Sequence, residues 1–236
     1  MKSTNRICSA LAIAVLLLAT RPASADFEIR LSDNNFSTYS TVVDNTNNAA
    51  GGTTLTGSFN GFTYSFLNGT SNSPGSDVKA VLDSSTASIT NNNSTTETLY
   101  ISIGAQDFTA PVTPPALILS SHIGTTVITG QPGDTLTFQS FVDTANGQNT
   151  TTGYTPGPQS LNLQGPNSPK SDAYAAIASL SANYSMTEYF KVTLAAGDSF
   201  NFSTNTQVST PEPASMTLWG LGLAVCGLVA RRRRRV

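Results

Sequence analysis

The sequence predicts an all-β protein, an antiparallel β-sandwich of jelly-roll-like or Greek-key topology with about nine to twelve short strands. Two observations on the central part of the chain support this. Ser, Thr and Asn make up 73 of the 185 residues from 26 to 210, and these residues favour strands and turns. Apolar residues recur there at alternate positions between Gly-, Pro- and Asn-rich turns. A signal helix and a transmembrane helix are expected at the two ends.

The first 25 residues have the features of a cleaved signal peptide. Lys2 and Arg6 precede an apolar run over residues 10–19, and Ala23-Ser24-Ala25 follows it. The apolar run is too short to span a hydrocarbon core of about 30 Å. We therefore expect a signal peptidase to cut after Ala25, with Ala23 and Ala25 as the small residues of its site.

The first strands are expected at residues 27–31 and 40–44, and a hairpin follows them. Leu55, Gly57 and Phe59 share one parity, whereas Phe62, Tyr64 and Phe66 share the other. Asn60-Gly61 lies between the two sets. Both of these residues tolerate the positive φ of a type I′ turn. The turn should pair Phe59 with Phe62 and place all six residues on one face.

Alternating apolar residues predict further strands along the chain, and Pro111, Pro114 and Pro115 should interrupt pairing. Residues 173–180 are ambiguous, because their alanines would also suit a short helix, although strand is favoured. Residues 146–170 are rich in Gly, Pro, Asn and Gln and predict a long exposed loop. The expected strand segments are 78–89, 99–103, 117–129, 136–142, 184–194 and 200–202.

Charge and cysteine content exclude several classes of function. Residues 26–209, the expected extracytoplasmic domain, hold four basic and thirteen acidic residues, a formal net charge near −9. Such a surface cannot neutralise phosphates, so nucleic acid is not an expected partner. Cys8 and Cys226 both lie outside this domain, which excludes a disulfide or a thiolate metal site within it. No cofactor or metal is expected.

The candidate chemical sites are few. His122 is the only histidine and lies in an apolar run, so it is interpreted as a strand-face or strand-end residue. No Gly-x-Ser-x-Gly sequence surrounds a serine. Residues 33–35 and 143–146 carry oxygen ligands that calcium could use, but turn formation explains both clusters.

Two further sets of residues bear on function. Glu28, Glu97 and Glu188 lie in expected strands and are interpreted as facing solvent, although a secreted hydrolase would need two carboxylates across a cleft. A carbohydrate-binding module would need exposed aromatic rings. The candidates are Tyr39, Tyr100, Tyr154 and Tyr174.

The C-terminal segment, residues 210–236, has three parts in a fixed order. Pro211-Glu212-Pro213 precedes seventeen uncharged residues, 214–230, and Arg231-Arg232-Arg233-Arg234-Arg235 follows. Each arginine would cost about 3 kcal/mol at the membrane centre, so the cluster should stay cytoplasmic. Hydropathy thus predicts a single transmembrane helix over 214–230.

This order resembles the PEP-CTERM sorting signal of Gram-negative bacteria. The resemblance covers about 27 residues and implies recognition by a membrane exosortase, cleavage near Pro211-Glu212-Pro213, and delivery to the cell surface or medium. The resemblance also implies a link to exopolysaccharide and to biofilm or floc formation. We therefore expect a non-catalytic surface or matrix protein. A carbohydrate-binding module and a secreted glycan hydrolase remain alternatives.

Overall fold

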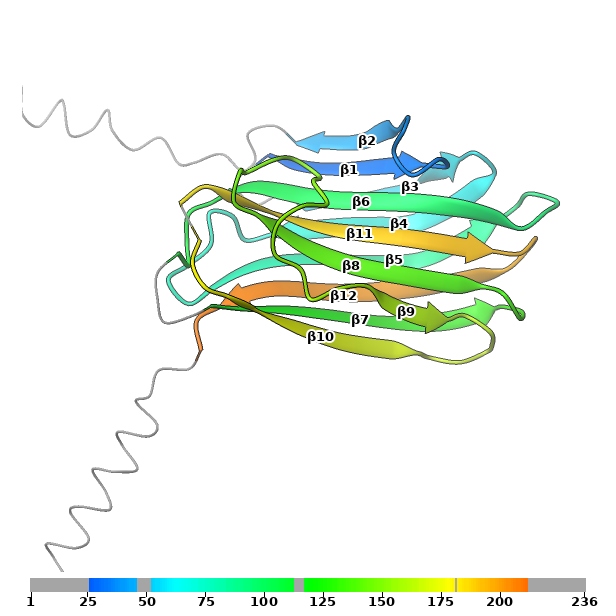
Figure 1. The fold of residues 1–236 in the computed structure, drawn as a ribbon. Helices are drawn as coiled ribbons and strands as arrows, with labels where there is room; N and C mark the ends of the chain where they lie inside the picture. The colour runs from blue at the N-terminus through cyan, green and yellow to red at the C-terminus, as the bar shows by residue number, and fades with distance from the viewer. Residues whose placement is uncertain (1–25, 46–51, 113–116, 181, 212–236) are drawn as a thin grey trace, which may run out of the picture.

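A computed structural model describes residues 26–45, 52–112, 117–180 and 182–211 (Figure 1). These residues form twelve strands and no helix, within the range of strand numbers that the sequence predicts. No described helix is long and apolar enough to cross a membrane. The expected signal peptide, with Ala23 and Ala25, and the expected transmembrane helix at 214–230 lie outside the described residues. The strands are β1 Phe27–Ser32, β2 Ser40–Asn45, β3 Gly52–Phe59, β4 Phe62–Ser71, β5 Lys79–Asn91, β6 Glu97–Phe108, β7 Leu117–Thr129, β8 Thr135–Asp143, β9 Gln159–Asn162, β10 Lys170–Ile177, β11 Tyr184–Leu194 and β12 Ser199–Ser209.

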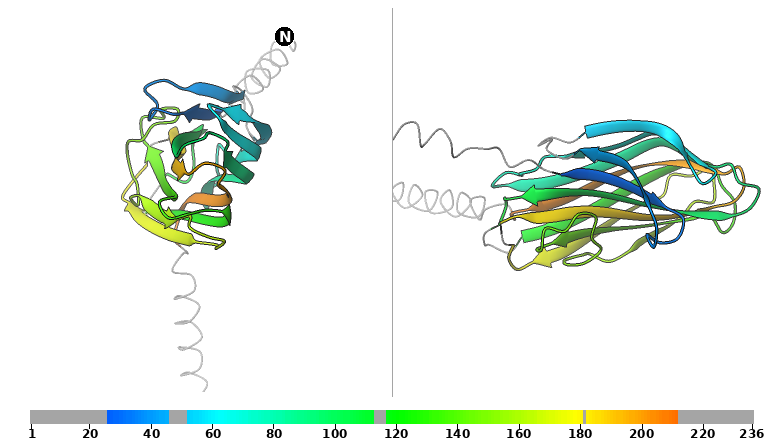
Figure 2. Two further views of the ribbon diagram at one scale, coloured as in Figure 1. Left: turned by 90° about the vertical axis from the view of Figure 1, so that its right-hand side faces the viewer. Right: turned by 90° about the horizontal axis from the view of Figure 1, so that it is seen from above.

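The strands form two antiparallel six-stranded sheets that lie face to face (Figures 1 and 2). Sheet A has the order β2-β1-β6-β11-β8-β9, and sheet B has the order β10-β7-β12-β5-β4-β3. Strands β5 to β12 alone give β6-β11-β8-β9 opposite β10-β7-β12-β5, which is the strand order of an eight-stranded jelly roll. The hairpins β1–β2 and β3–β4 extend one sheet each. Of the two expected topologies, the jelly roll fits this order.

The core lies between the two sheets. Each strand buries its alternate residues, so Leu99, Ile101 and Ile103 of β6 point inward as the sequence predicts. Aromatic rings join the layers at the centre. Phe190 of sheet A lies 5.0 Å from Phe138 of its own sheet and 4.7 Å from Phe202 of sheet B, between ring centroids.

The hairpin β3–β4 confirms the predicted turn but corrects one residue. Phe59 pairs with Phe62, and Asn60 and Gly61 have φ of 45° and 80°. Phe66, however, is 63% exposed instead of facing the core. The register shifts between Leu55 and Gly57, and this bulge reverses the alternation.

The expected exposed loop at 146–170 is also corrected. The segment includes strand β9, which pairs with β8, and it buries Gln159, Leu161 and Leu163. A four-residue strand is too short to give a clear alternation in sequence. Residues 170–177 form strand β10 rather than a helix, which confirms the favoured interpretation.

The interpretation of Glu188 as a solvent-facing residue is wrong. Its exposure is 0%, because it follows the parity of Phe190 and Val192 and therefore points between the sheets. Three hydroxyls from sheet B donate to its carboxylate, those of Ser84, Thr204 and Thr206. Burial raises the pKa of Glu188 to about 7, against the opposing effect of these hydrogen bonds.

Candidate functional site

A cavity of about 530 Å³ opens on the outer face of sheet A. Its floor is formed by the outward-facing residues of four neighbouring strands. Arg30 of β1 pairs with Ser102 of β6, Ser102 with Tyr189 of β11, and Tyr189 with Gln139 of β8. Because paired residues in a sheet point to the same side, these four side chains form one row across the floor. The remaining lining residues are Asn35, Phe36, Tyr39, Phe141, Asn149 and Thr151.

One wall of the cavity is aromatic. The ring of Phe36 lies 6.3 Å from that of Tyr100 and 5.9 Å from that of Tyr189. Phe36 reaches the sheet face because the turn between β1 and β2 holds both Asn35 and Phe36 at positive φ, 56° and 61°. The Ser32 hydroxyl fixes this turn by accepting the Phe36 N–H at 3.0 Å.

Two polar contacts hold the rings in place. The Tyr189 hydroxyl donates to Asn35 Oδ1 at 2.7 Å, and burial, with a smaller contribution from Tyr100, raises the pKa of Tyr189 to about 12. The hydroxyl of Tyr189 therefore stays protonated near neutral pH and remains a hydrogen-bond donor. The second contact is that of the Arg30 guanidinium, which lies 4.5 Å from the centre of the Tyr39 ring, a cation–π distance.

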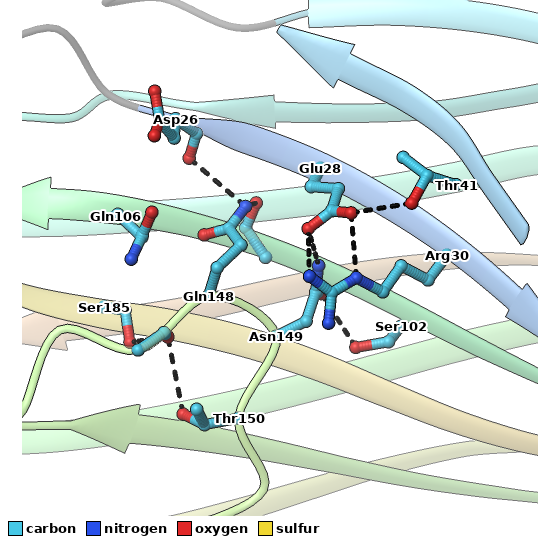
Figure 3. Close-up of polar contacts among 12 residues, drawn as sticks. Asp26, Glu28, Arg30, Thr41, Ser102, Gln106, Gln148, Asn149, Thr150 and Ser185 are labelled. Carbon is cyan, nitrogen blue, oxygen red and sulfur yellow. Dashed lines mark hydrogen bonds and ion pairs between the residues drawn. The ribbon is translucent and has the colours of Figure 1, made fainter. Parts of the chain in front are cut away.

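The opposite wall is the chain segment 144–158, which folds back over sheet A. Asp143 fixes its beginning by accepting the N–H groups of Ala145 and Gly147 at 3.0 and 3.1 Å. The side chain of Asn149 then joins the segment to the floor, because it accepts from Ser102 at 2.8 Å and donates to Glu28 at 3.1 Å (Figure 3). This wall is thus held by side chains of three strands.

Gly104 of β6 makes room for this wall. A Cβ atom at Gly104 would lie 2.7 Å from Asn149 Oδ1, which is closer than side chains approach. The Gln148 amide donates to the Gly104 carbonyl at 3.2 Å. A glycine at this position therefore lets the 144–158 segment rest directly on the sheet.

A partly buried ion pair joins one residue of the floor, Arg30, to Glu28. Arg30 donates two hydrogen bonds to Glu28, at 2.8 and 2.6 Å, and Thr41 donates a third at 2.8 Å (Figure 3). Burial alone would raise the pKa of Glu28, but the hydrogen bonds and charge of Arg30, with Thr41 and Asn149, hold it below its usual value. Glu28 is therefore an anion matched by Arg30, and the pair contributes no net charge.

The structure brings together two of the four tyrosines proposed from the sequence. Tyr39 lines the cavity and is 50% exposed. Tyr100 does not line the cavity, but its ring contacts those of Phe36 and Tyr189, which do. Tyr154 belongs to the 144–158 segment but does not line the cavity, and its hydroxyl lies 3.4 Å from the Ser179 carbonyl. Tyr174 lies on strand β10 of the other sheet and is 68% exposed.

Most of the cavity residues were not predicted from the sequence. The alternation of β1 already places Arg30 opposite in parity to Phe27, Ile29 and Leu31, so its outward direction could have been found. The positions of Phe36 and Asn149 depend on turns and cross-strand neighbours, and no local pattern reveals them.

The remaining candidates behave as their sequence context indicates. His122 lies on the outer face of β7, with 43% of its side chain exposed. Asn34 Oδ1 accepts the Thr38 N–H at 3.0 Å, and Asp143 caps its own turn, so both oxygen clusters form turns. Glu97 is exposed, as expected. In the described parts of the chain, no group of three or more His, Cys, Asp or Glu residues could hold a metal ion.

Comparisons with solved structures give partial likenesses at low identity. A structure of the infectious bursal disease virus Gx strain is 11% identical, with 83% of this chain and 54% of that chain covered and a TM-score of 0.30. An arabinose-bound α-L-arabinofuranosidase is 10% identical, with 67% and 25% covered and a TM-score of 0.29. An isomalto-dextranase of Arthrobacter globiformis T6, complexed with panose, is 11% identical, with 78% and 30% covered and a TM-score of 0.26. This chain thus spans about half or less of each of those proteins, and no curated protein matches it by sequence.

The C-terminal segment gives a defined match. Residues 209–235 match the family model of the PEP-CTERM protein-sorting motif. The matched region contains Pro211-Glu212-Pro213 and all five arginines, and it begins at Ser209, the last residue of β12. The motif implies exosortase-dependent processing, membrane association of the C-terminus and export. The chain therefore carries a PEP-CTERM protein-sorting motif in residues 209–235.

Proposed function

We propose that the protein is a non-catalytic component of the cell surface or extracellular matrix, and that its jelly-roll domain binds neutral polysaccharide in the cavity of sheet A. The sorting motif supports the location, with an N-terminal signal peptide cut after Ala25 and a C-terminal helix whose arginines stay cytoplasmic until the tail is removed. The polysaccharide is the matrix exopolysaccharide around the cell, and the protein contributes to biofilm or floc formation.

The combination of one aromatic wall and one amide-bearing wall carries this proposal. A sugar ring presents C–H groups on its faces and hydroxyls around its edge. Phe36, Tyr39 and Tyr189 supply rings for the faces, while Gln139 and Asn149 supply both donors and acceptors for the hydroxyls. The volume of about 530 Å³ lies within the range of small-ligand sites, about 300–1,000 Å³.

The charge of the domain favours a neutral ligand. Residues 26–209 carry a net charge near −9, which repels a polyanion at low ionic strength. Arg30 is the one basic residue among the described residues that line the cavity, and it already shares its charge with Glu28 at 2.6 Å. A carboxylate on the ligand would therefore compete with Glu28 for Arg30.

The ionised state of Glu28 supports a binding role over hydrolysis. A glycosidase uses a pair of carboxyl groups, one of which must be protonated to act as an acid. Glu28 is held as an anion, with its pKa lowered, and the lining residues that the structure describes include no aspartate or glutamate. This arrangement favours holding a glycan intact.

The test is binding of the 26–211 fragment, which contains both sheets, to immobilised neutral polysaccharides, with an acidic one in parallel. Tyr189→Ala should weaken binding to a neutral polysaccharide by about tenfold or more, since it removes a stacking ring and the hydrogen bond to Asn35. Tyr174→Ala removes an exposed tyrosine from the other sheet and is the matched control. Equal binding by the wild-type and Tyr189→Ala fragments would refute the site, and preference for the acidic polysaccharide would refute the ligand class.

A further inference from the structure

Sheet B has a hollow of its own on the outer face, with a volume of about 470 Å³. It lies above Gly124 in the middle of β7. Gly124 pairs with Ser203 of β12 on one side and with Lys170 of β10 on the other. The same outer face carries His122, which pairs with Asn205 and Asp172. Ser85 of β5 also lines the hollow, so its floor is formed by four neighbouring strands, β10, β7, β12 and β5.

Gly124 has no structural reason within the protein to be glycine. A Cβ atom there would meet only His122 Nε2 at 3.8 Å and Ser203 Oγ at 3.9 Å, which are ordinary contacts. Every other glycine whose surroundings the structure describes has either a positive φ or an atom within 3.0 Å of the Cβ position. A glycine weakens the interior of a strand, and it often marks a place where a ligand approaches the backbone closely.

His122 is oriented toward this open space by a partner on the edge strand. Its Nδ1 atom lies 2.5 Å from Asp172 Oδ1. A carboxylate can only accept, so Nδ1 carries the proton and, in the neutral ring, Nε2 is left as an acceptor. Nε2 is also the ring atom nearest to the Gly124 hollow. Because Nδ1 is taken by Asp172, Nε2 is the ring nitrogen left to bond to a ligand above the sheet.

The rim of the hollow is also held in place. The turn between β9 and β10 is fixed to β7, because Thr125 N–H donates to the Pro169 carbonyl at 3.0 Å and Val127 N–H donates to the Asn167 carbonyl at 2.8 Å. Lys170 follows directly and contributes an ammonium donor. The lining is otherwise mainly hydroxyl and amide groups, which suit a ligand rich in hydroxyls.

We propose that the hollow above Gly124 is a second saccharide-binding site, on the side of the sandwich opposite the sheet A cavity. Its ligand is a neutral saccharide whose hydroxyls bond to His122, Ser203 and Lys170. The consequence, which rests on the proposed function, is that one molecule bridges two polysaccharide chains. Bridging would link chains in a matrix, whereas a single site would only coat them.

The experiment uses the full chain in a detergent without a sugar headgroup, with soluble dextran and hydroxyethylcellulose as probes and alginate as the acidic comparison. Tyr189→Ala disables the sheet A cavity, so the binding that remains reports on the second site. Adding Gly124→Val should fill the hollow and weaken this remaining binding by about tenfold or more. The Gly124→Val chain should unfold at the same temperature as wild type or a higher one, because valine favours strands.

Ser120→Val is the matched control, because Ser120 also faces outward on β7 but does not line the hollow. It should leave binding unchanged. Bridging is measured as the turbidity of dextran solutions. The wild-type chain should raise the turbidity, and either Tyr189→Ala or Gly124→Val should abolish this rise.

The outcomes separate the two sites. Complete loss of binding in Tyr189→Ala alone would overturn the second site and leave the proposed function standing. Normal binding in Tyr189→Ala with loss in Gly124→Val would retain the second site and refute the sheet A cavity. Residual binding that Gly124→Val does not weaken, or a preference for alginate, would overturn the second saccharide site on sheet B.

Discussion

Ser84 of β5 and Glu188 of β11 come from opposite sheets, and the Ser84 hydroxyl donates to the Glu188 carboxylate at 2.5 Å in the centre of the sandwich. Thr204 and Thr206 donate to the same carboxylate, each at 2.8 Å. Among the residues that the structure describes, the hydrogen-bond donors to this carboxylate are uncharged hydroxyls, so a buried charge there is only partly compensated. A carboxyl group in this position makes the stability of the fold depend on pH.

We predict that stability falls as the pH rises from about 4.5 to about 7. Burial raises the pKa of Glu188 from 4.5 to about 7 in the folded protein, so the folded state binds the proton more tightly than the unfolded chain. The contribution of Glu188 to the free energy of unfolding is fully present below its pKa in the unfolded chain and is lost as the pH rises through its pKa in the folded protein. Between pH 5 and pH 8 the loss in the free energy of unfolding should be about 2–3 kcal/mol, measured by urea unfolding at the two pH values.

Glu188→Gln is the control for this prediction. The amide keeps the shape and an acceptor oxygen but cannot ionise, so most of the difference between pH 5 and pH 8 should disappear. Glu28 has a lowered pKa, so its contribution to stability has the opposite pH dependence. That contribution is lost as the pH falls through the pKa of the folded state, below the pH range tested for Glu188. An unchanged pH profile in Glu188→Gln would show that another group causes the dependence.

Replacement of Gly104 by alanine should damage the sheet A cavity. The new Cβ atom would lie 2.7 Å from Asn149 Oδ1 and push the 144–158 segment off the sheet. We expect a loss of stability of about 1–3 kcal/mol and weaker saccharide binding. Gly124→Ala is the matched variant, since it places the same atom in open space, and it should not destabilise the fold. Equal unfolding midpoints for the two variants would contradict this account.

The turn between β3 and β4 should tolerate no side chain at Gly61. Its φ is +80°, and a Cβ atom would overlap the side chain of Asn93. Gly61→Ala should cost about 1–2 kcal/mol of stability in thermal unfolding. Gly133 also has a positive φ, +105°, but nothing lies within 4 Å. A smaller loss in Gly133→Ala would isolate the contribution of Asn93, whereas an equal loss would assign the whole effect to backbone strain.

The mass of the protein recovered from medium and from washed cells should report both processing steps. We expect a species that begins at Asp26 and ends near Pro213, because the matched sorting motif covers residues 209–235. Recovery of a mature form that still carries Arg231 to Arg235 would reduce the motif to a plain membrane anchor in this protein.

Much of the local structure could be read from alternation and turn residues. The Asn60-Gly61 turn and the bounds of β7 agree closely with the sequence prediction, since each depends on residues that are close in the chain. Phe66 departs from it because a bulge shifts the register. A bulge leaves only a weak signal in sequence, since it reflects what the partner strand requires.

The candidate site shows the same division. The outward direction of Arg30 and Tyr189 follows from parity within their strands. The residues that surround them do not follow from parity. Phe36 reaches Tyr189, and Asn149 reaches the β1 and β6 side of the floor, from turns that are distant in sequence from those strands. Glu188 was misjudged for a related reason. Its parity matches that of Phe190 and Val192, but a carboxylate is normally buried only where hydrogen-bond donors meet it. Here the donors are hydroxyls of the other sheet, which the local sequence does not reveal.

The sequence by itself determined the β class of the protein and its PEP-CTERM sorting motif, because composition, alternation and a contiguous motif are properties of short stretches of chain. Only the tertiary structure decided which strands are neighbours, and with them the cavity on sheet A, the hollow above Gly124 and the buried Glu188. Each of these places depends on side chains brought together across strands, and strand order is set by packing of the whole chain rather than by any local segment.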